Sequence, residues 1–408
     1  MRVLFCSRRF FPAISGMSVY AANLLQELVT AGHDVSMVSQ YRGDAAGTRI
    51  YGGGPPPGVP GVRVLGLRSL GEEVIPADFE RDVAEMLDTI LTEHARAPFD
   101  ILHAQYGYPN GWAVLLAARQ LGVPAVVSIQ GGDGHWVGSC CETHRQAMLR
   151  VMAHADALLI GCESFAAEVM ERLGVSRERF TIVPGAVDVG RFRPVQPPGA
   201  AASPPRLLYH GRVDARKGVL DFLAALRLLR DDGVDFEAVV SGIGPDHDAA
   251  QALARELGLE IRFTGHAAYD DAPTVYAMGD IFVSPTYAEG FSNTILEAMA
   301  SGLPCVSCHA VGVMDCLRAN ENGLLVEPGD VPAQAAALRR LMADPALRQR
   351  LAQAALEECR RTYSWSAVGR QIMDIYGGLR GTAPRAANMD AQLPHDRDCR
   401  FRAAPHLL

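Results

Sequence analysis

The sequence predicts an α/β protein built from two consecutive domains, each with an open parallel sheet. Short apolar runs rich in β-branched residues alternate with longer segments of helical spacing, which is typical of parallel strands joined by helices. The chain has 408 residues, more than a single hydrophobic core usually spans. A proline-rich stretch near the middle interrupts the alternation, which then starts again. We therefore expect two domains and a linker.

The first half of the chain alternates between strands and helices from its beginning. Its predicted strands are Val3–Cys6, Val35–Val38, Asp100–His103, Ala125–Ile129, Ala157–Gly161 and Phe180–Val183. Helical spacing occurs in Ser18–Ala31, Glu80–His94 and Gly111–Leu121, and Gly32 ends the first of these helices. Residues 52–61 consist mostly of glycine and proline and predict a loop.

The second half begins after the prolines of residues 194–205, which we interpret as the interdomain linker. The strands predicted beyond it are Arg206–His210, Phe236–Ser241, Ile261–Phe263, Ile281–Ser284, Pro304–Ser307 and Leu324–Val326. Ser364–Leu379 has the spacing of one more amphipathic helix. Residues 381–408 lack apolar periodicity, and we interpret them as a disordered tail.

Composition excludes several classes of protein. Hydrophobic residues make up 49% and charged residues 21%, values typical of a globular protein. The net charge of −8 argues against a general nucleic-acid binder, which needs a basic surface. Apolar runs stay shorter than the ~18 residues that a membrane span requires. The N-terminus resembles a first strand rather than a signal peptide. Nine scattered cysteines favour a reducing cytoplasm over a disulfide framework.

Two groups of cysteine and histidine residues raise the question of a zinc site. Cys305 and Cys308 have C-x-x-C spacing but lie in a predicted strand, where residues three apart point to opposite faces. The second group comprises His135, Cys140, Cys141 and His144, and its spacing matches no standard zinc pattern. We interpret both groups as ordinary thiols and imidazoles, with zinc as the alternative, and expect no metal site.

Residues after the first strand of the second half suit a diphosphate. Gly211 and Arg212 follow that strand, and Lys217 lies just beyond them. Ligands of open α/β sheets bind outside the carboxyl ends of the strands. Arg binds phosphate with a planar fork and Lys with a point charge. From these residues alone, an ordinary solvated loop stays the alternative, since charged loops are common.

The most informative segment is residues 288–298, Ala-Glu-Gly-Phe-Ser-Asn-Thr-Ile-Leu-Glu-Ala. It follows a predicted strand and opens a helix, whose free N–H groups suit phosphate oxygens, and Gly290 allows close approach of the backbone. Glu289 can accept hydrogen bonds from sugar hydroxyls, and Glu297 from a ribose. Thr294 and Glu297 also have capping-box spacing, so a purely structural Glu297 and a plain surface Glu289 stay open.

Together these segments resemble the retaining glycosyltransferases of family 4. Glu289 and Glu297 have the family's spacing, with Gly290-Phe291 after the first and Ala298-Met299-Ala300 after the second. Further matching segments follow in the family's order: Gly32-His33-Asp34-Val35, Ile182-Val183-Pro184, Val187-Asp188, Gly211-Arg212, Lys217-Gly218, Gly242-Ile243-Gly244-Pro245, Asn322-Gly323-Leu324-Leu325-Val326 and Tyr363-Ser364-Trp365. The resemblance extends to about residue 380.

This resemblance implies the GT-B fold, in which two Rossmann-like domains face each other across a cleft. Residues 1–193 would form the acceptor-binding domain, with a crossover helix at 364–380 packing back on it. After the linker at 194–205, residues 206–363 would form the nucleotide-sugar-binding domain.

The resemblance also implies a role for each matching residue. Arg212 and Lys217 would bind the donor diphosphate and, with Glu289, carry catalysis. Glu289 would contact hydroxyls of the donor sugar, and Glu297 would bind the nucleotide ribose. Phosphate and sugar would be held at the start of the helix by Gly290, Phe291, Ser292, Asn293 and Thr294. Members of this family generally need no metal ion, so we expect no cofactor beside the substrate, a UDP- or GDP-sugar.

Several loops depart from the family pattern. Only Gly16 remains of a usual glycine pair, and Gln130 replaces a frequent histidine. Glutamine can still position a hydroxyl but carries no charge, so both residues stay donor-binding candidates. Asp133 matches an acidic position and is a candidate acceptor-binding residue, with a structural turn aspartate as the alternative. Residues 311–315, Val-Gly-Val-Met-Asp, replace a more usual Gly-Gly-x-x-Glu.

We therefore expect a retaining hexosyltransferase that moves sugar from a nucleotide diphosphate to an acceptor hydroxyl. The acceptor would be a sugar, a lipid-linked molecule or another small molecule. Another enzyme on the same fold, such as an epimerase or a sugar-phosphate synthase, is one alternative, and a non-catalytic binding subunit is another. Arg8-Arg9-Phe10-Phe11 mixes cations with aromatics, so this segment could contact the inner face of the membrane or an anionic acceptor, but we favour an ordinary loop.

Overall fold

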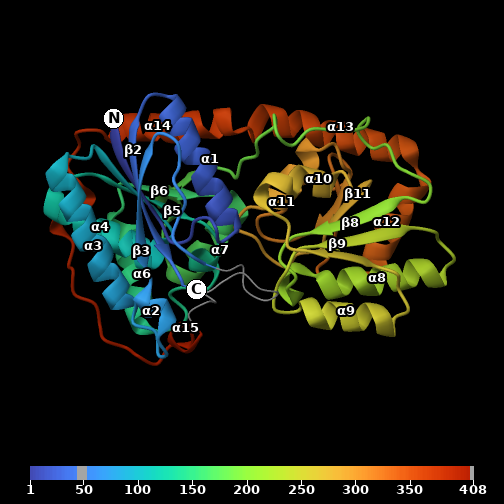
Figure 1. Ribbon diagram of the computed structural model, residues 1–408, viewed down its shortest axis with the longest axis horizontal. Coiled ribbons are helices and arrows are strands. Elements are labelled where there is room, and N and C mark those ends of the chain that lie inside the picture. Colours follow the sequence, from blue (N-terminus) through green and yellow to red (C-terminus); the bar gives the residue numbers. More distant parts are fainter. Residues whose placement is uncertain (44–52, 405–408) are drawn as a thin grey trace. The chain divides into compact units, whose positions relative to one another are not determined.

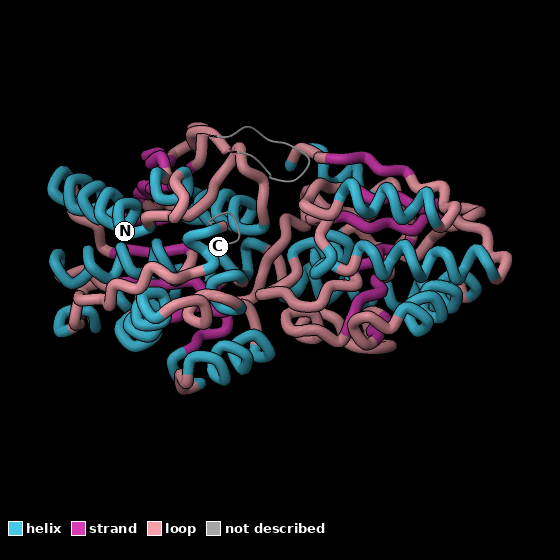
Figure 2. Tube along the Cα trace, turned by 90° about the horizontal axis from the view of Figure 1, so that it is seen from below, coloured by secondary structure: helices cyan, strands magenta, loops and turns pink. Residues whose placement is uncertain are grey.

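The computed structural model describes residues 1–43 and 53–404, which fall into two compact units. The N-terminal unit comprises residues 1–43, 53–184 and 368–404, and the C-terminal unit comprises residues 185–367. In each unit, helices enclose a central sheet (Figures 1 and 2), and every strand pairing within the two sheets is parallel. The predicted α/β architecture is confirmed.

The sheet of the N-terminal unit has seven strands in the order β3-β2-β1-β4-β5-β6-β7. The strands are β1 (Arg2–Ser7), β2 (Asp34–Tyr41), β3 (Val62–Arg68), β4 (Ile101–Gln105), β5 (Ala125–Ile129), β6 (Ala157–Ile160) and β7 (Phe180–Ile182). Chain order reverses between β1 and β4, so the loops at their carboxyl ends flank the position where such sheets bind ligands.

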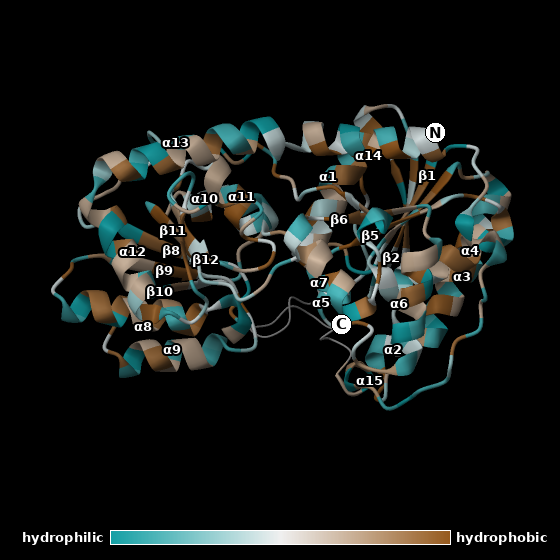
Figure 3. Ribbon diagram, turned by 180° about the vertical axis from the view of Figure 1, so that it is seen from behind, coloured by the Kyte–Doolittle hydropathy of each residue, from teal (hydrophilic) through white to brown (hydrophobic). Residues whose placement is uncertain are grey.

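Burial explains which strands the sequence predicts. Every residue of β4 and β5 is buried, so these strands appear as short, continuous apolar runs. In Figure 3 the strands of both units are largely brown, the colour of apolar residues. The edge strand β3 is half exposed along its length. The sequence did not predict β3, because its alternating residues follow directly on a glycine- and proline-rich stretch.

Helices cover both units. Those of the N-terminal unit are α1 (Gly16–Thr30), α2 (Leu70–Glu73), α3 (Phe79–Arg96), α4 (Trp112–Leu121), α5 (Gly132–His135), α6 (Glu142–His154), α7 (Glu163–Leu173) and, in the tail, α15 (Arg400–Ala403). Those of the C-terminal unit are α8 (Val219–Asp231), α9 (His247–Glu256), α10 (Ala272–Tyr276), α11 (Asn293–Ala300), α12 (Val331–Ala343) and α13 (Pro345–Thr362). Helix α14 (Trp365–Leu379) crosses from one unit to the other between Ala367 and Val368.

The sheet of the C-terminal unit has six strands in the order β10-β9-β8-β11-β12-β13. The strands are β8 (Arg206–His210), β9 (Glu237–Ser241), β10 (Arg262–Gly265), β11 (Ile281–Ser284), β12 (Cys305–Cys308) and β13 (Leu324–Val326). Here the chain order reverses between β8 and β11, and this switch point lies where the sequence concentrates its phosphate-binding candidates.

The predicted linker, residues 194–205, is not a free connector. It belongs to the C-terminal unit, whose boundary falls at residue 185. Gly199 donates to the carbonyl of Gly302 at 3.1 Å and accepts from Arg348 Nε at 3.1 Å. Ala202 donates to Asp280 Oδ2 at 3.0 Å. Its prolines remove backbone donors, but the remaining groups tie the segment to the unit, so this part of the prediction is wrong.

The prediction of a disordered tail is also wrong for residues 381–404. Ala386, Met389, Cys399 and Phe401 are buried against the N-terminal unit. Arg385 donates its backbone N–H to Asp156 Oδ1 at 2.9 Å. The tail is held by isolated buried residues and hydrogen bonds rather than by an apolar face, which is why its sequence shows no periodicity.

Among the helices of the described residues, none combines the length and apolar character that crossing a membrane requires.

Arg402 provides a test of the ordered tail. Its guanidinium is buried, donates to both carboxylate oxygens of Glu80 at 2.6 and 2.9 Å, and also donates to the carbonyl of Ala77 at 2.9 Å. We expect Arg402→Ala to lower the free energy of unfolding by about 1–3 kcal/mol, measured by urea denaturation. Arg397→Ala, in the same tail but exposed, is the control, and equal stability of the two variants would contradict a docked tail.

Candidate active site

The switch point of the C-terminal unit brings together the residues that the sequence singled out. The loop after β8 carries Arg212 and Lys217, and the segment after β11 leads through Glu289 into α11. Since β8 and β11 are paired parallel neighbours, both loops leave the sheet at the same edge. Residues far apart in the sequence therefore meet at one site.

Lys217 and Glu289 form the central contact of this site. Lys217 Nζ lies 2.7 Å from Glu289 Oε2 and 3.3 Å from the carbonyl of Ala288. The side chains are 31% and 18% exposed, so the pair is partly shielded yet open to a ligand. Gly218 makes the approach possible: its φ is +72°, and a Cβ there would lie 2.0 Å from the carbonyl oxygen of Pro285. A larger residue would push the lysine loop away from β11.

The loop after β12 supports Glu289 from the other side. Glu289 donates its N–H to the carbonyl of Val311 at 2.9 Å. Gly312 has φ +74°, and a Cβ there would lie 2.3 Å from the carbonyl oxygen of Glu289. The loop that departs from the family pattern thus fixes the backbone of the first glutamate.

Arg212 lies beside a shared carboxylate. Its Nε is 3.4 Å from Asp214 Oδ2, and its side chain is 34% exposed. Asp214 also accepts from the backbone and side chain of Arg216, both through Oδ1, at 2.9 and 3.1 Å. Burial raises the pKa of Asp214, but the hydrogen bonds from Arg216 outweigh it and leave that pKa below its usual value. Asp214 therefore stays ionised, orients Arg212, and starts the turn that carries Lys217.

The start of α11 completes the predicted anion site. Ser292 precedes the helix and is buried, and its side chain makes no capping hydrogen bond within the described structure. The N–H groups of Asn293 and Thr294 open the first turn, where such groups lack intrahelical partners and the dipole favours negative charge. Gly211, at the end of β8, faces this turn, since a Cβ there would lie 4.0 Å from Thr294 Cγ2.

Gly290 and Phe291 connect Glu289 to the helix. The Phe291 ring packs against Tyr363, with ring centroids 5.5 Å apart, and a Cβ on Gly185 would lie 2.6 Å from it. The side chain of Phe291 is therefore partly buried and used in packing.

Glu297 is a buried acid rather than a capping residue. Helix α11 begins at Asn293, so Glu297 lies in its second turn, and the capping-box alternative with Thr294 is wrong. Its Oε2 accepts from the Tyr276 hydroxyl at 2.6 Å. Burial raises the pKa of Glu297 to about 7, although the Tyr276 hydrogen bond acts in the opposite direction. A neutral or ionised carboxyl is thus available near neutral pH.

Tyr276 and His210 are site residues that sequence reasoning missed. The Tyr276 hydroxyl oxygen also lies 3.2 Å from the carbonyl oxygen of Thr294, and its ring lies edge-on to His210, with centroids 5.3 Å apart. His210 contacts Ser241 Oγ through Nδ1 at 3.1 Å, and burial lowers its pKa to about 4. Tyr276 comes from α10, which carries no recognisable motif.

In the N-terminal unit, Gln105 links two predicted site loops. Its Nε2 donates to Gln130 Oε1 at 3.1 Å and to the carbonyl of Met17 at 2.9 Å. Gly16, the first residue of α1, is exposed beside Met17, and Gln130 is half-buried. The buried Gln105 therefore holds both loops at the carboxyl edge of this sheet. Its position at the end of β4 is the feature that could have identified it.

Asp133 does not have the exposure that the acceptor-binding role requires. The residue is fully buried. Its Oδ1 accepts the N–H groups of Gln130 and Gly131 at 3.0 Å each, and Oδ2 accepts that of Gly107 at 2.8 Å. The structure corrects this prediction. Asp133 is a structural aspartate that orders the loop carrying Gln130, which was the alternative interpretation.

Arginines at the end of β1 have a structural partner. Arg8 is buried and paired with Glu72 of α2. Arg9 and Arg42 lie 3.7 and 3.8 Å from Glu72 Oε2. Phe10 is also buried. The side chains of Arg8 and Phe10 are therefore used inside the N-terminal unit, and membrane contact of this segment stays a prediction.

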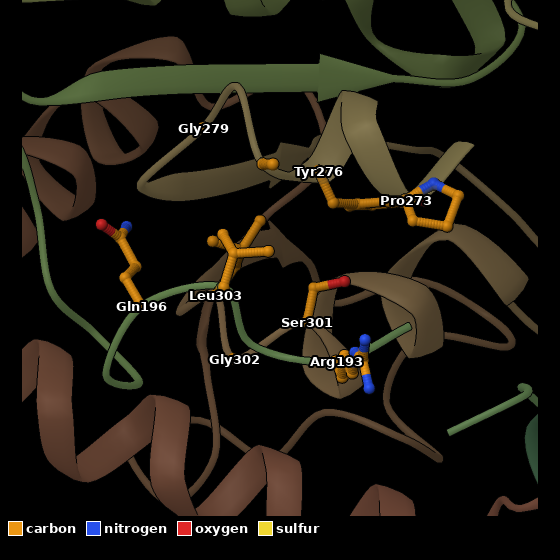
Figure 4. A pocket seen from close by; sticks show the side chains of 10 residues that line it. Arg193, Gln196, Pro273, Tyr276, Gly279, Ser301, Gly302 and Leu303 are labelled. Atoms are coloured by element: carbon orange, nitrogen blue, oxygen red, sulfur yellow. The ribbon is translucent and has the colours of Figure 1, made fainter. Parts of the chain in front are cut away.

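The C-terminal unit also has a small pocket (Figure 4). Its lining includes Tyr276 and Gly279, just before β11, and Ser301 and Leu303, just before β12. It therefore opens at the amino ends of these strands, opposite the edge that carries Lys217 and Glu289. Tyr276 belongs both to the pocket lining and to the candidate active site, and the other lining residues lie outside that site.

Solved structures with the same arrangement define the class. Sucrose-phosphate synthase from Thermosynechococcus elongatus is 22% identical with a TM-score of 0.78, covering 93% of this chain and 98% of that one. Anabaena HepE in complex with UDP and glucose is 17% identical with a TM-score of 0.70, covering 92% and 99%. The protein has the GT-B fold, with two Rossmann-like domains, as predicted.

Sequence comparisons identify the family. Residues 194–358 match the model for glycosyl transferases group 1, and residues 15–186 match that for the glycosyl transferase 4-like domain. Glycogen synthase from Mycobacterium tuberculosis is 26% identical over 97% of this chain and its own full length. D-inositol 3-phosphate glycosyltransferase from Salinispora tropica is 28% identical over 89% of this chain and 80% of that protein. The chain belongs to the group 1 glycosyltransferases of the family 4 type, and is a transferase enzyme.

The buried acid Glu297 predicts a pH-dependent stability. With a pKa of about 7 against an ordinary value of 4.5, the folded protein holds a proton that the unfolded chain has already lost. Stability from this group is therefore fully present below pH 4.5 and falls as the pH rises through about 7. We expect Glu297→Gln, which stays neutral, to lack this decline, a difference of up to about 3 kcal/mol.

Urea denaturation of both proteins across this pH range measures the effect. Parallel stability curves for the wild type and Glu297→Gln would show that Glu297 ionises normally and would contradict the buried-acid assignment.

Proposed function

We propose that this enzyme transfers a hexose from a nucleotide diphosphate to an acceptor hydroxyl with retention of anomeric configuration. The observation that carries the proposal is the Lys217–Glu289 pair, with Nζ 2.7 Å from Oε2. It lies at the switch point of the C-terminal sheet, beside the start of α11. A cation and a helix start suit a diphosphate, and a neighbouring carboxylate suits sugar hydroxyls.

In this proposal the leaving diphosphate is stabilised by fixed charge. Arg212 and Lys217 bind its oxygens, and the N–H groups at the start of α11 supply further hydrogen bonds. Such preorganised donors act most strongly where negative charge develops during the reaction. Since this charge lies on the leaving group, its stabilisation lowers the barrier to breaking the glycosidic bond.

Glu289 then positions the sugar. One carboxylate oxygen holds Lys217, which leaves lone pairs to accept hydrogen bonds from hydroxyls of the hexose. The acceptor hydroxyl attacks the anomeric carbon from the face that the diphosphate leaves, and its proton passes to a diphosphate oxygen. The acceptor oxygen forms the new bond as the diphosphate takes the electrons of the old one, so configuration is retained.

Glu297 is the proposed ribose ligand. Glu297 as a whole is 8% exposed, and the Tyr276 hydroxyl is bonded to one of its carboxylate oxygens. The other oxygen is available to a pair of ribose hydroxyls. The Tyr276 hydrogen bond fixes the orientation of the carboxyl group before the nucleotide binds, which reduces the entropy lost on binding.

We further propose that the transfer itself uses no metal ion, because Arg212, Lys217 and the helix dipole supply positive charge at the diphosphate. HepE in complex with UDP-glucose supports a nucleotide-sugar donor by its likeness in fold. The relatives act on different acceptors by name, glycogen and inositol 3-phosphate.

The ion pair gives a direct test of the donor site. We expect Lys217→Ala and Glu289→Ala each to lower kcat/KM for transfer by about 10²–10³-fold while thermal melts stay close to the wild type. Because the two groups are in contact, the double variant should be about as slow as the slower single variant.

Arg227→Ala is the matched control, since Arg227 belongs to the same unit but pairs with the exposed Asp231. Its transfer rate should equal that of the wild type. A purified, folded Glu289→Ala enzyme with the wild-type rate would refute the assigned role of Glu289.

A panel of nucleotide-sugars tests the donor and the stereochemistry. We expect UDP- or GDP-hexoses to raise the melting temperature, since a ligand that binds the folded state stabilises it by mass action. Nuclear magnetic resonance of the product should show the anomeric configuration of the donor.

Inverted product would contradict retention. Nucleotide release that needs no acceptor would favour an epimerase or a hydrolase. Donor binding without turnover across glucans, polyols and their phosphates would favour a non-catalytic subunit.

A further inference from the structure

One group of potential metal ligands belongs to the N-terminal unit, whereas Lys217 and Glu289 belong to the C-terminal unit. Cys140, Cys141 and His144 lie at the start of α6, and Cys399 reaches them from the tail. Their ligand atoms all lie within 4.8 Å of one another. We call these four residues the Cys-His cluster. The sequence grouped His135 with the first three, but His135 Nδ1 contacts Glu168 at 2.8 Å instead.

The spacing of these atoms fits a tetrahedral zinc ion. Zinc binds thiolate sulfur at about 2.3 Å and imidazole nitrogen at about 2.0 Å, so a tetrahedron separates sulfur from nitrogen by about 3.5 Å. His144 Nδ1 lies 3.1 Å from Cys140 Sγ and 3.6 Å from Cys399 Sγ. Only small side-chain movements would be needed to place all four atoms around one ion.

The imidazole of His144 is directed towards the sulfur atoms. Its ring is fully buried against Tyr108 and Phe79, with centroids 4.5 and 5.6 Å away. Within the described residues, Nε2 is buried without a hydrogen-bond partner. The polar contacts of this ring are therefore made through Nδ1, which faces the cysteines.

The backbone on both sides of the cluster is already fixed. Thr143 lies between Cys141 and His144 in the sequence. Its hydroxyl accepts the N–H of Asp396 at 2.8 Å and donates to the carbonyl of Pro394 at 2.7 Å. Glu142 donates its N–H to Asp396 Oδ2 at 3.0 Å. Beyond Cys399, Arg402 is buried and bound to Glu80. Cys399 is thus held against α6 by contacts that precede and follow it.

We propose that Cys140, Cys141, His144 and Cys399 bind a structural Zn²⁺ ion that fastens the C-terminal tail to the N-terminal unit. Three thiols lose their protons on binding, and His144 coordinates as the neutral imidazole through Nδ1. Four protein ligands fill the tetrahedron and leave no position for substrate, which is typical of structural rather than catalytic zinc. The site is therefore separate from the metal-free transfer proposed above and does not depend on it.

The metal content of the full chain tests this proposal. We expect protein purified under reducing conditions to contain about one zinc per chain by mass spectrometry of the elements. Cys399→Ser should lower the affinity for added Zn²⁺ by at least about 100-fold. Replacing a residue that only hydrogen-bonds to a metal ligand already lowers metal affinity by up to about 100-fold, and Cys399 would be a ligand itself. The substitution should also make the tail sensitive to limited proteolysis.

Cys162→Ser is the matched control. Cys162 is also buried but lies outside the cluster, at the residue before α7, where serine suits a helix N-cap. This variant should keep its zinc. Because Cys399 lies in the tail, its substitution is not expected to unfold either sheet, and circular dichroism checks this.

Cobalt gives a second measurement. The metal-free chain with added Co²⁺ should develop the thiolate-to-cobalt absorption and the intense visible bands of tetrahedral coordination, and Cys399→Ser should not. A chain that contains no zinc and binds none, that contains iron instead, or that forms a disulfide among these cysteines under the same conditions overturns the proposal.

Discussion

The C-terminal unit depends on how closely the loops after neighbouring parallel strands approach one another. Lys217 reaches Glu289 only because Gly218 allows its loop to lie against the end of β11. Gly312 allows the loop after β12 to lie against Glu289 in the same way. Both glycines have positive φ, a conformation that larger residues adopt at a cost. The electrostatic pair is therefore a consequence of backbone packing at the switch point of the sheet.

In the N-terminal unit, buried side chains rather than glycines fix the loops at the carboxyl ends of the strands. Asp133 and Gln105 are buried polar residues whose hydrogen bonds define the loops after β5, β4 and β1. A buried polar group costs free energy unless it is hydrogen-bonded. The hydrogen bonds of these two residues therefore strongly favour one conformation of each loop. Gln130 is thereby oriented without any charge of its own.

Much of this could be predicted from the sequence, and the exceptions share a cause. Buried strands such as β5 are continuous apolar runs, and Arg212, Lys217, Glu289 and Glu297 occur in recognisable local segments. Tyr276, Gln105 and Cys399 act through partners distant in the chain, so no local pattern reveals them. Asp133 shows the converse, since a local match indicated a ligand-binding acid where the fold uses a buried structural one.

The proposed transfer site and the Cys-His cluster differ in where their negative charge comes from. At the proposed transfer site, the diphosphate of a nucleotide-sugar would bring negative charge, which fixed cations and a helix start would complement. In the Cys-His cluster the protein itself would supply the negative charge, as thiolates, and a bound cation is what would stabilise them. Within its described residues the tail buries Ala386, Met389, Cys399 and Phe401 at scattered positions, and hydrogen bonds hold the backbone between them. A short, hydrogen-bonded tail is the kind of segment for which a metal ion adds most to the free energy of docking.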